Sequence, residues 1–109
     1  MSAHENPHAG QGSVLLDIGG DVGALVVVAP DAMTGREVEI APAGESFRAV
    51  HRPHVAVVRR PVVGGAVASL VFPAVAAGRY ALAEKGTADV RLVVEVRGGE
   101  VTGAAWPAD

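Results

Sequence analysis

The segment Arg36-Glu37-Val38-Glu39-Ile40 alternates strictly between charged and apolar residues. Successive side chains of a β-strand point to opposite sides, so Val38 and Ile40 share one face while Glu37 and Glu39 share the other. This pattern predicts a strand with one buried face and one face in water. Residues 90–96 alternate in the same way and predict a second strand of this kind.

Turn signals divide the rest of the chain into short β-rich runs at intervals of about 8–12 residues, which is typical of a sandwich or a barrel. Glycine pairs and prolines end most of these runs, and no stretch sustains a helical period with capping residues. We therefore predict an all-β fold, an antiparallel β-sandwich of about seven to nine strands. The domain is expected to span residues 13–109, after a flexible polar tail at residues 1–12.

Five of the expected strands lie beside local reversals of the chain. Residues 14–18 and 24–29 flank a glycine-rich cluster and are predicted to form a hairpin. Residues 90–96 and 101–106 flank a second glycine pair and are predicted to form a final hairpin. A further strand is expected over residues 66–72, ending at a proline-bearing turn.

The stretch Leu70-Val71-Phe72-Pro73-Ala74-Val75-Ala76-Ala77-Gly78-Arg79-Tyr80-Ala81-Leu82 resembles the corner of transthyretin-like sandwiches, including carboxypeptidase regulatory-like and Cna-B-type domains. An apolar strand, a proline-bearing turn and a Gly-x-Tyr-x-Leu motif recur there. The ending, with Val94-Glu95-Val96 before Gly98-Gly99-Glu100-Val101-Thr102, is similar to the last hairpin of those domains. The resemblance implies a transthyretin-like or immunoglobulin-like sandwich.

Two further expectations follow from resemblance. Cna-B-type domains often carry an internal Lys–Asn isopeptide bond, but the only lysine is Lys85 and the only asparagine is Asn6, in the expected tail. No such crosslink is therefore expected. The chain as a whole also resembles short actinobacterial proteins of uncharacterised function, which implies no activity.

Composition excludes several classes of function. The chain has 9 basic and 12 acidic residues, a net charge of -3, and no basic stripe interleaved with aromatic residues, so we expect no nucleic-acid partner. Without cysteine there can be no disulfide and no thiolate ligand. The longest apolar run, residues 24–30, falls short of the roughly 20 residues that cross a bilayer. The N-terminal residues lack the apolar core of a secretion signal, so a cytoplasmic location without membrane contact is expected.

No catalytic residue and no cofactor is assigned. Residues 16–21, Leu-Asp-Ile-Gly-Gly-Asp, resemble the first phosphate loop of sugar kinases, but 109 residues cannot hold that two-lobed fold, so a glycine-rich turn is expected instead. Ser69 lies in an apolar run, where its hydroxyl is expected to bond to neighbouring backbone. Trp106 and Tyr80 could line a ligand pocket, although a core so poor in aromatic residues is expected to need them for filling.

The segment His51-Arg52-Pro53-His54 is the one grouping whose residue types suit a transition metal. His51 and His54 are therefore the candidate metal ligands. Residues three apart on a strand point to opposite faces, so these imidazoles converge only in a tight turn. A third ligand would come from His4, Glu5 or His8, or from a symmetry-related subunit. The alternative is a set of solvated loop histidines.

The preferred function is a non-enzymatic interaction module that self-associates as a homodimer or binds another protein. Residues 25–28 and 92–94 are apolar on both faces of their strands, so we expect a partner subunit to cover one of these faces. The alternative is a small metal- or ligand-binding protein built around the histidines, and an enzyme is the third option.

Overall fold

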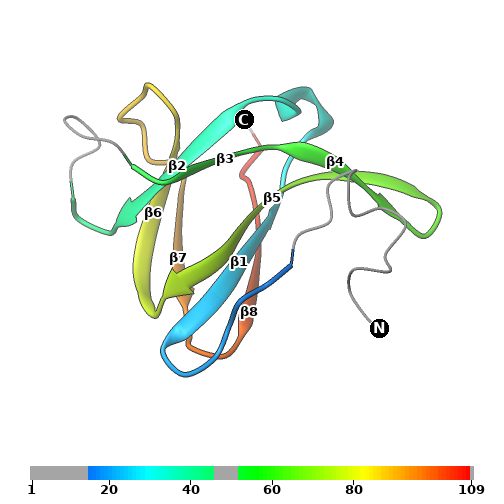
Figure 1. Cartoon of the computed structure of the whole chain (residues 1–109). Helices are drawn as coiled ribbons and strands as arrows, with labels where there is room; N and C mark the ends of the chain where they lie inside the picture. Colours follow the sequence, from blue (N-terminus) through cyan, green and yellow to red (C-terminus); the bar gives the residue numbers. More distant parts are fainter. Residues whose placement is uncertain (1–14, 46–51, 109) are drawn as a thin grey trace.

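The computed structural model describes residues 15–45 and 52–108, which form two four-stranded β-sheets packed face to face (Figure 1). The strands are β1 (Val22–Val28), β2 (Glu37–Pro42), β3 (His54–Ala56), β4 (Val58–Val62), β5 (Gly65–Ala76), β6 (Gly78–Glu84), β7 (Leu92–Val96) and β8 (Val101–Ala105). A single 3-10 turn, η3 (Asp31–Met33), follows β1. The predicted β-sandwich is confirmed.

Sheet A has the strand order β4-β5-β1-β8 and sheet B the order β3-β2-β6-β7. All pairings are antiparallel except that of β1 with β8, which is parallel. The chain changes sheets between β3 and β4 at Val57, whose amide donates to Arg36 O at 2.8 Å while its carbonyl accepts from the Gly35 amide at 2.8 Å. These two bonds hold the corner, and residues 54–59 therefore divide between the two sheets.

The core lies between the sheets and is built mainly from aliphatic side chains. Val38 and Ile40 are buried within it, whereas Glu37 is exposed, as their alternation predicts. Trp106 is also buried in the core, which confirms its expected role as a filler. Its ring is covered by the guanidinium of Arg91, whose Cζ lies 5.9 Å from the ring centroid.

Both predicted terminal hairpins are wrong. Residues 15–18 are not a strand, and β1 pairs instead with β5 and β8. The glycines do form a tight turn, in which Gly19 and Val22 exchange two backbone hydrogen bonds of 2.9 Å. The final turn joins β7 to β8, but these strands lie in different sheets. Local alternation identifies strands without identifying their partners, which here are distant in sequence.

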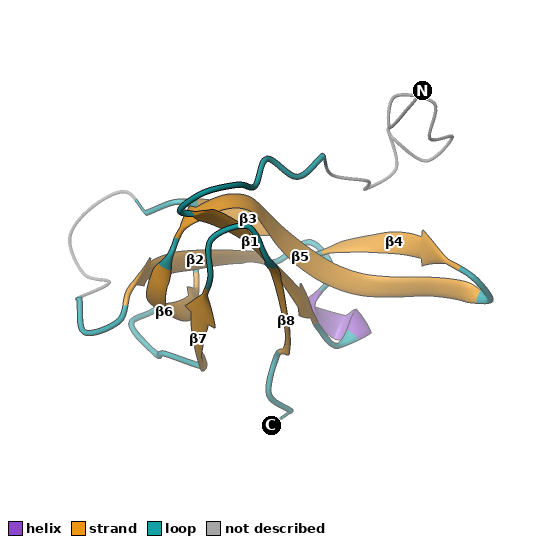
Figure 2. Cartoon of the chain, turned by 90° about the horizontal axis from the view of Figure 1, so that it is seen from below, coloured by secondary structure: helices purple, strands orange, loops and turns teal. Residues whose placement is uncertain are grey.

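The turn expected at Pro73 is also displaced. β5 continues through Pro73 to Ala76, and the reversal comes at Ala77 before β6. Pro73 has no amide to donate, but its carbonyl accepts from the Asp17 amide at 3.2 Å. Residues 15–20 pass over the outer side of sheet A at this point (Figure 2). Across the described residues, no helix has the length and apolar character needed to span a membrane.

Candidate functional site

The outer faces of the two sheets differ sharply in chemistry. Strand register places His54 beside Glu39 and Arg79 beside Glu95 on the outer side of sheet B. Glu37 lies on the same side and its Oε1 is 3.1 Å from Lys85 Nζ. An antiparallel sheet commonly has one face in water, and a charged outer face of this kind is suited to that exposure.

The outer face of sheet A is apolar. We call it the valine face, and its members are Val26, Val28, Val58, Val62, Val67, Val101, Gly103 and Ala105. Val28 is 48% exposed and Val101 is 49% exposed, so these side chains leave much of their apolar surface in water. Val71 also points to this side but is buried. Its position on β5 is close to Pro73, where residues 15–20 cross the sheet.

Arg60 is the one charged residue whose strand register places it on the valine face within the described ranges 15–45 and 52–108. Its Nη1 donates to Ser69 Oγ at 2.9 Å and also to the backbone carbonyl of Ser69. Burial lowers the pKa of Arg60 from its ordinary value. An arginine stays protonated at neutral pH despite such a shift, so this face carries a cation that donates hydrogen bonds to acceptors of its own hairpin.

Sequence reasoning did not find this arginine. Ser69 was expected to bond to neighbouring backbone, and instead its hydroxyl accepts from a side chain on the adjacent strand. Val58 pairs with Ser69 and Arg60 with Val67, so the contact is a diagonal one across two strands. Only the register of β4 against β5 could have revealed it.

The hairpin formed by β4 and the first half of β5 projects beyond the rest of the sandwich (Figure 2). β1 pairs with β5 only from Ser69 onward, and just beyond that pairing the Ala29 amide donates to the Ala68 carbonyl, so residues 65–67 of β5 have β4 as their one strand partner. The tip is apolar, with Val62 49% exposed and Val63 fully exposed. The valine face therefore extends onto a projecting arm.

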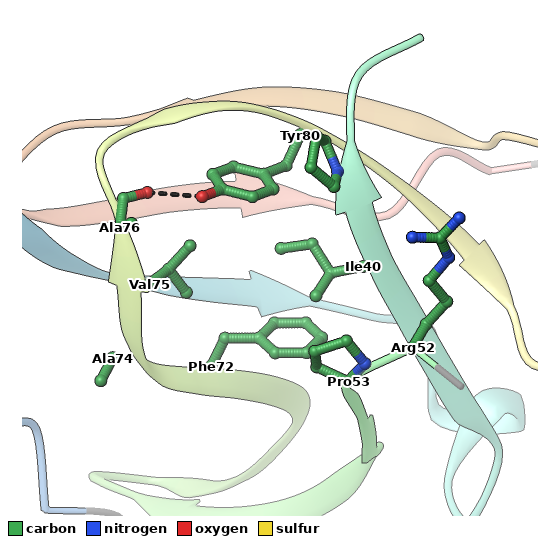
Figure 3. A pocket seen from close by; sticks show the side chains of 9 residues that line it. Ile40, Arg52, Pro53, Phe72, Ala74, Val75, Ala76 and Tyr80 are labelled. Carbon is green, nitrogen blue, oxygen red and sulfur yellow. Dashed lines mark hydrogen bonds between the residues drawn. The ribbon is translucent and has the colours of Figure 1, made fainter. Parts of the chain in front are cut away.

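A pocket of about 270 Å³ opens at one end of the sandwich, between β2, β5 and β6. Its lining combines core side chains with residues at the mouth: Ile40, Pro42, Arg52, Pro53, Phe72, Ala74, Val75, Ala76 and Tyr80. Ile40, Phe72 and Val75 are buried, so the pocket reaches the edge of the core (Figure 3).

Two polar side chains border this apolar pocket. The Tyr80 hydroxyl donates to the Ala76 carbonyl at 2.7 Å, which holds the ring across the β5–β6 turn (Figure 3). Tyr80 thus lines a pocket as well as packing against the core, two roles that the sequence offered as alternatives. Arg52 is mostly buried, and its Nη1 lies 2.9 Å from Glu45 Oε1.

The predicted metal ligands are only partly described. His51 lies outside the described residues, as do His4, Glu5 and His8. His54 lies on β3 with its Nδ1 3.2 Å from Arg52 O and its Nε2 3.4 Å from Glu37 Oε1. In the part of the chain that the structure describes, no group of three metal-ligating side chains is present. Glu37 is a neighbour of His54 that sequence spacing did not indicate, and the metal site stays a prediction.

Comparisons with known proteins return no matching family model, no matching curated protein and no matching solved structure. The site must therefore be interpreted from its own geometry.

Proposed function

We propose that this domain is a non-enzymatic interaction module that self-associates through the valine face. The observation that carries the proposal is the contrast between the two sheets, one with a charged outer face and the other with an apolar one. Exposed apolar patches of this kind mark interaction surfaces in soluble proteins.

A second copy of the chain is the partner that this face suits. Homodimer interfaces are more apolar than transient ones, and a two-fold contact places the same surface on both sides. The valine face contains small and branched side chains, so a two-fold contact would bring apolar surface against apolar surface. Arg60 adds one cation from each copy, but Ser69 already accepts its hydrogen bonds, which lessens the cost of burying it.

The size of the face suits a weak dimer. The four strands of sheet A have 7, 5, 12 and 5 residues, and at about 3.3 Å per residue and about 4.8 Å per strand they cover about 460 Å² per copy. A two-fold contact would thus bury about 900 Å² in total, which is in the range of weak, concentration-dependent interfaces. The projecting β4–β5 arm supplies part of this area.

The test compares Val101→Lys with a matched control, Val93→Lys. Both valines lie on five-residue edge strands and are exposed to nearly the same extent, 49% and 47%, but Val101 is on the valine face and Val93 is on the charged face. The wild-type chain should sediment at twice the 11.0 kDa monomer mass. Val101→Lys should weaken the dimer by about tenfold or more, since a buried lysine costs over about 1.4 kcal/mol, while Val93→Lys should leave it unchanged.

A wild-type monomer at all concentrations up to several hundred micromolar would contradict the proposal. Equal dissociation of the two variants would contradict the assignment to the valine face. A chain that covers this face with its own residues would also stay monomeric, and that result would count against self-association.

A further inference from the structure

We infer that the free edge of β8 pairs with the same edge of a second copy of the chain, as two antiparallel strands related by a two-fold axis at Gly103. β8 lies at the end of sheet A beside β1 (Figure 1), which is its one strand neighbour within residues 15–45 and 52–108. The contact uses backbone groups in the plane of the sheet, whereas the valine face uses side chains above it. The inference therefore goes beyond the proposed function and does not depend on it.

The backbone of β8 presents alternate residues to its free edge. The Ala24 amide donates to the Glu100 carbonyl at 3.0 Å. The Trp106 amide donates to the Val28 carbonyl at 2.8 Å, so residues 100 and 106 both face β1. Backbone groups alternate in direction along a strand, and residues 102 and 104 therefore face β1 as well. The residues whose amides and carbonyls point away from the sheet are exposed, and they are Val101, Gly103 and Ala105.

The other three edge strands of the described residues have features that discourage pairing with another chain. β3 has three residues, and β4 contains Pro61, which has no amide to donate. β7 carries the exposed charge of Glu95, whose carbonyl also accepts from the Thr102 hydroxyl at 3.3 Å. β8 has five residues without a charge or a proline. Short strands, charges and prolines protect sheet edges from pairing, so β8 is the least protected of the four.

The symmetry of this edge is the reason for choosing a second copy as its partner. The outward groups are spaced evenly about Gly103, so a two-fold axis there places Val101 of one copy opposite Ala105 of the other. Opposed residues of this kind exchange two hydrogen bonds, which gives about six backbone hydrogen bonds in total. The side chains also suit this register, because Val101 and Thr102 each lie opposite an alanine and no like charges meet.

The test is amide hydrogen exchange in the full ¹⁵N-labelled chain that carries Val62→Lys. Val62 is 49% exposed on β4, the strand of sheet A farthest from β8, so this charge weakens the valine-face contact and leaves the β8 edge unchanged. We expect the edge contact to have a dissociation constant of about 1 mM, since it buries little side-chain surface.

Raising the concentration of this chain should protect the edge amides selectively. Between about 0.1 mM and about 2 mM, exchange at Val101, Gly103 and Ala105 should slow by about twofold, as the fraction of paired strands rises. The amide of Val93 is the matched control, because it lies on β7 at the edge of sheet B, and its exchange rate should not change.

Two substitutions at Gly103 test the backbone contact directly. Gly103→Pro removes the central amide of the free edge, which β1 does not use, and its ring blocks close approach of a second strand. Association should weaken by about tenfold or more. Gly103→Ala keeps the amide, so its association should stay within about twofold of that of the parent chain. Sedimentation equilibrium measures both variants, and thermal unfolding checks that both fold.

Exchange at the three edge amides that does not depend on concentration would overturn the inference. If these amides were already protected at the lowest concentration, the chain's own residues would cover the edge in place of a second copy. Undiminished association of Gly103→Pro would overturn the inference as well, and the exchange measurement decides the matter if that variant does not fold. Failure of the valine face is seen separately, as a Val62→Lys chain that associates as tightly as the wild type.

Discussion

The guanidinium of Arg60 is tied to Ser69 across the β4–β5 hairpin, with 2.9 Å between Nη1 and Oγ. Ser69 is only 6% exposed, and the Arg60 Nη1 also bonds to the carbonyls of Ser69 and Val58. The one cation on this apolar face thus donates its hydrogen bonds to β4 and β5 themselves. These bonds fix the position of the charge on the face.

Ser69→Ala removes one of these acceptors and leaves the two carbonyls in place. We expect a loss of about 1 kcal/mol in the free energy of unfolding, less than the roughly 1.5–3 kcal/mol of a hydrogen bond to a charged group, because the remaining acceptors still bind Arg60. The measurement is urea denaturation of a double-mutant cycle with Arg60→Met. A coupling energy below about 0.3 kcal/mol would show that the two residues act independently.

Gly98→Ala should destabilise the domain strongly. A Cβ at Gly98 would collide with the backbone carbonyl of Gly20, in the turn that precedes β1, and backbone cannot move aside as a side chain can. We expect a loss of about 3 kcal/mol or more, since two turns must separate.

The control for this variant is Gly103→Ala. Gly103 lies on β8 with nothing within 4 Å of a Cβ built there, so its replacement should be neutral or stabilising by up to about 1 kcal/mol. Thermal unfolding of both variants checks the pair. Similar melting temperatures would contradict the close approach of the two turns.

Leu70→Ala should open a cavity at the centre of the sandwich. Leu70 is fully buried on β5 and belongs to the core cluster shared by both sheets. The expected loss is about 2–5 kcal/mol, from the lost burial of the side chain and the space left behind. Denaturant unfolding measures it, and a change under about 1 kcal/mol would mean that the sheets close around the gap.

A metal site that includes His51 and His54 makes a separate prediction. Zinc at about 100 times its dissociation constant should add about 2.7 kcal/mol of stability, and His54→Ala should abolish the gain. Glu37→Gln should reduce the gain as well if Glu37 completes the site, because its Oε1 lies 3.4 Å from His54 Nε2. An unchanged melting temperature with zinc, nickel and copper would exclude the metal hypothesis.

Sequence periodicity was sufficient for the strands whose two faces differ. Val38 and Ile40 are inside and Glu37 is outside because the alternation of charge decides the orientation of β2. It was insufficient for β1, where Leu25 and Val27 face the core and Val26 and Val28 face outward with the same chemistry. A strand that is apolar on both faces is expected to be a central strand or to lie at an interface, but this pattern does not identify the strands that pair with it.

The pocket could not be predicted for a related reason. Its inner part joins Ile40 of β2 to Phe72 and Val75 of β5, and these strands belong to different sheets. Each residue alone has the pattern of a core position. Only the packing of one sheet against the other brings these residues to the edge of a common space, and spacing along the chain does not reveal that packing.

The parallel pairing of β1 with β8 has a consequence for synthesis of the chain. In sheet A, β1 is synthesised first and its neighbour β8 last. During translation, one side of β1 therefore has no backbone partner until Ala105 emerges from the ribosome. Long-range pairing of this kind is slow to form and leaves the growing chain exposed to aggregation. A messenger truncated before the codon for Val101 should therefore yield protein that accumulates in inclusion bodies or is degraded.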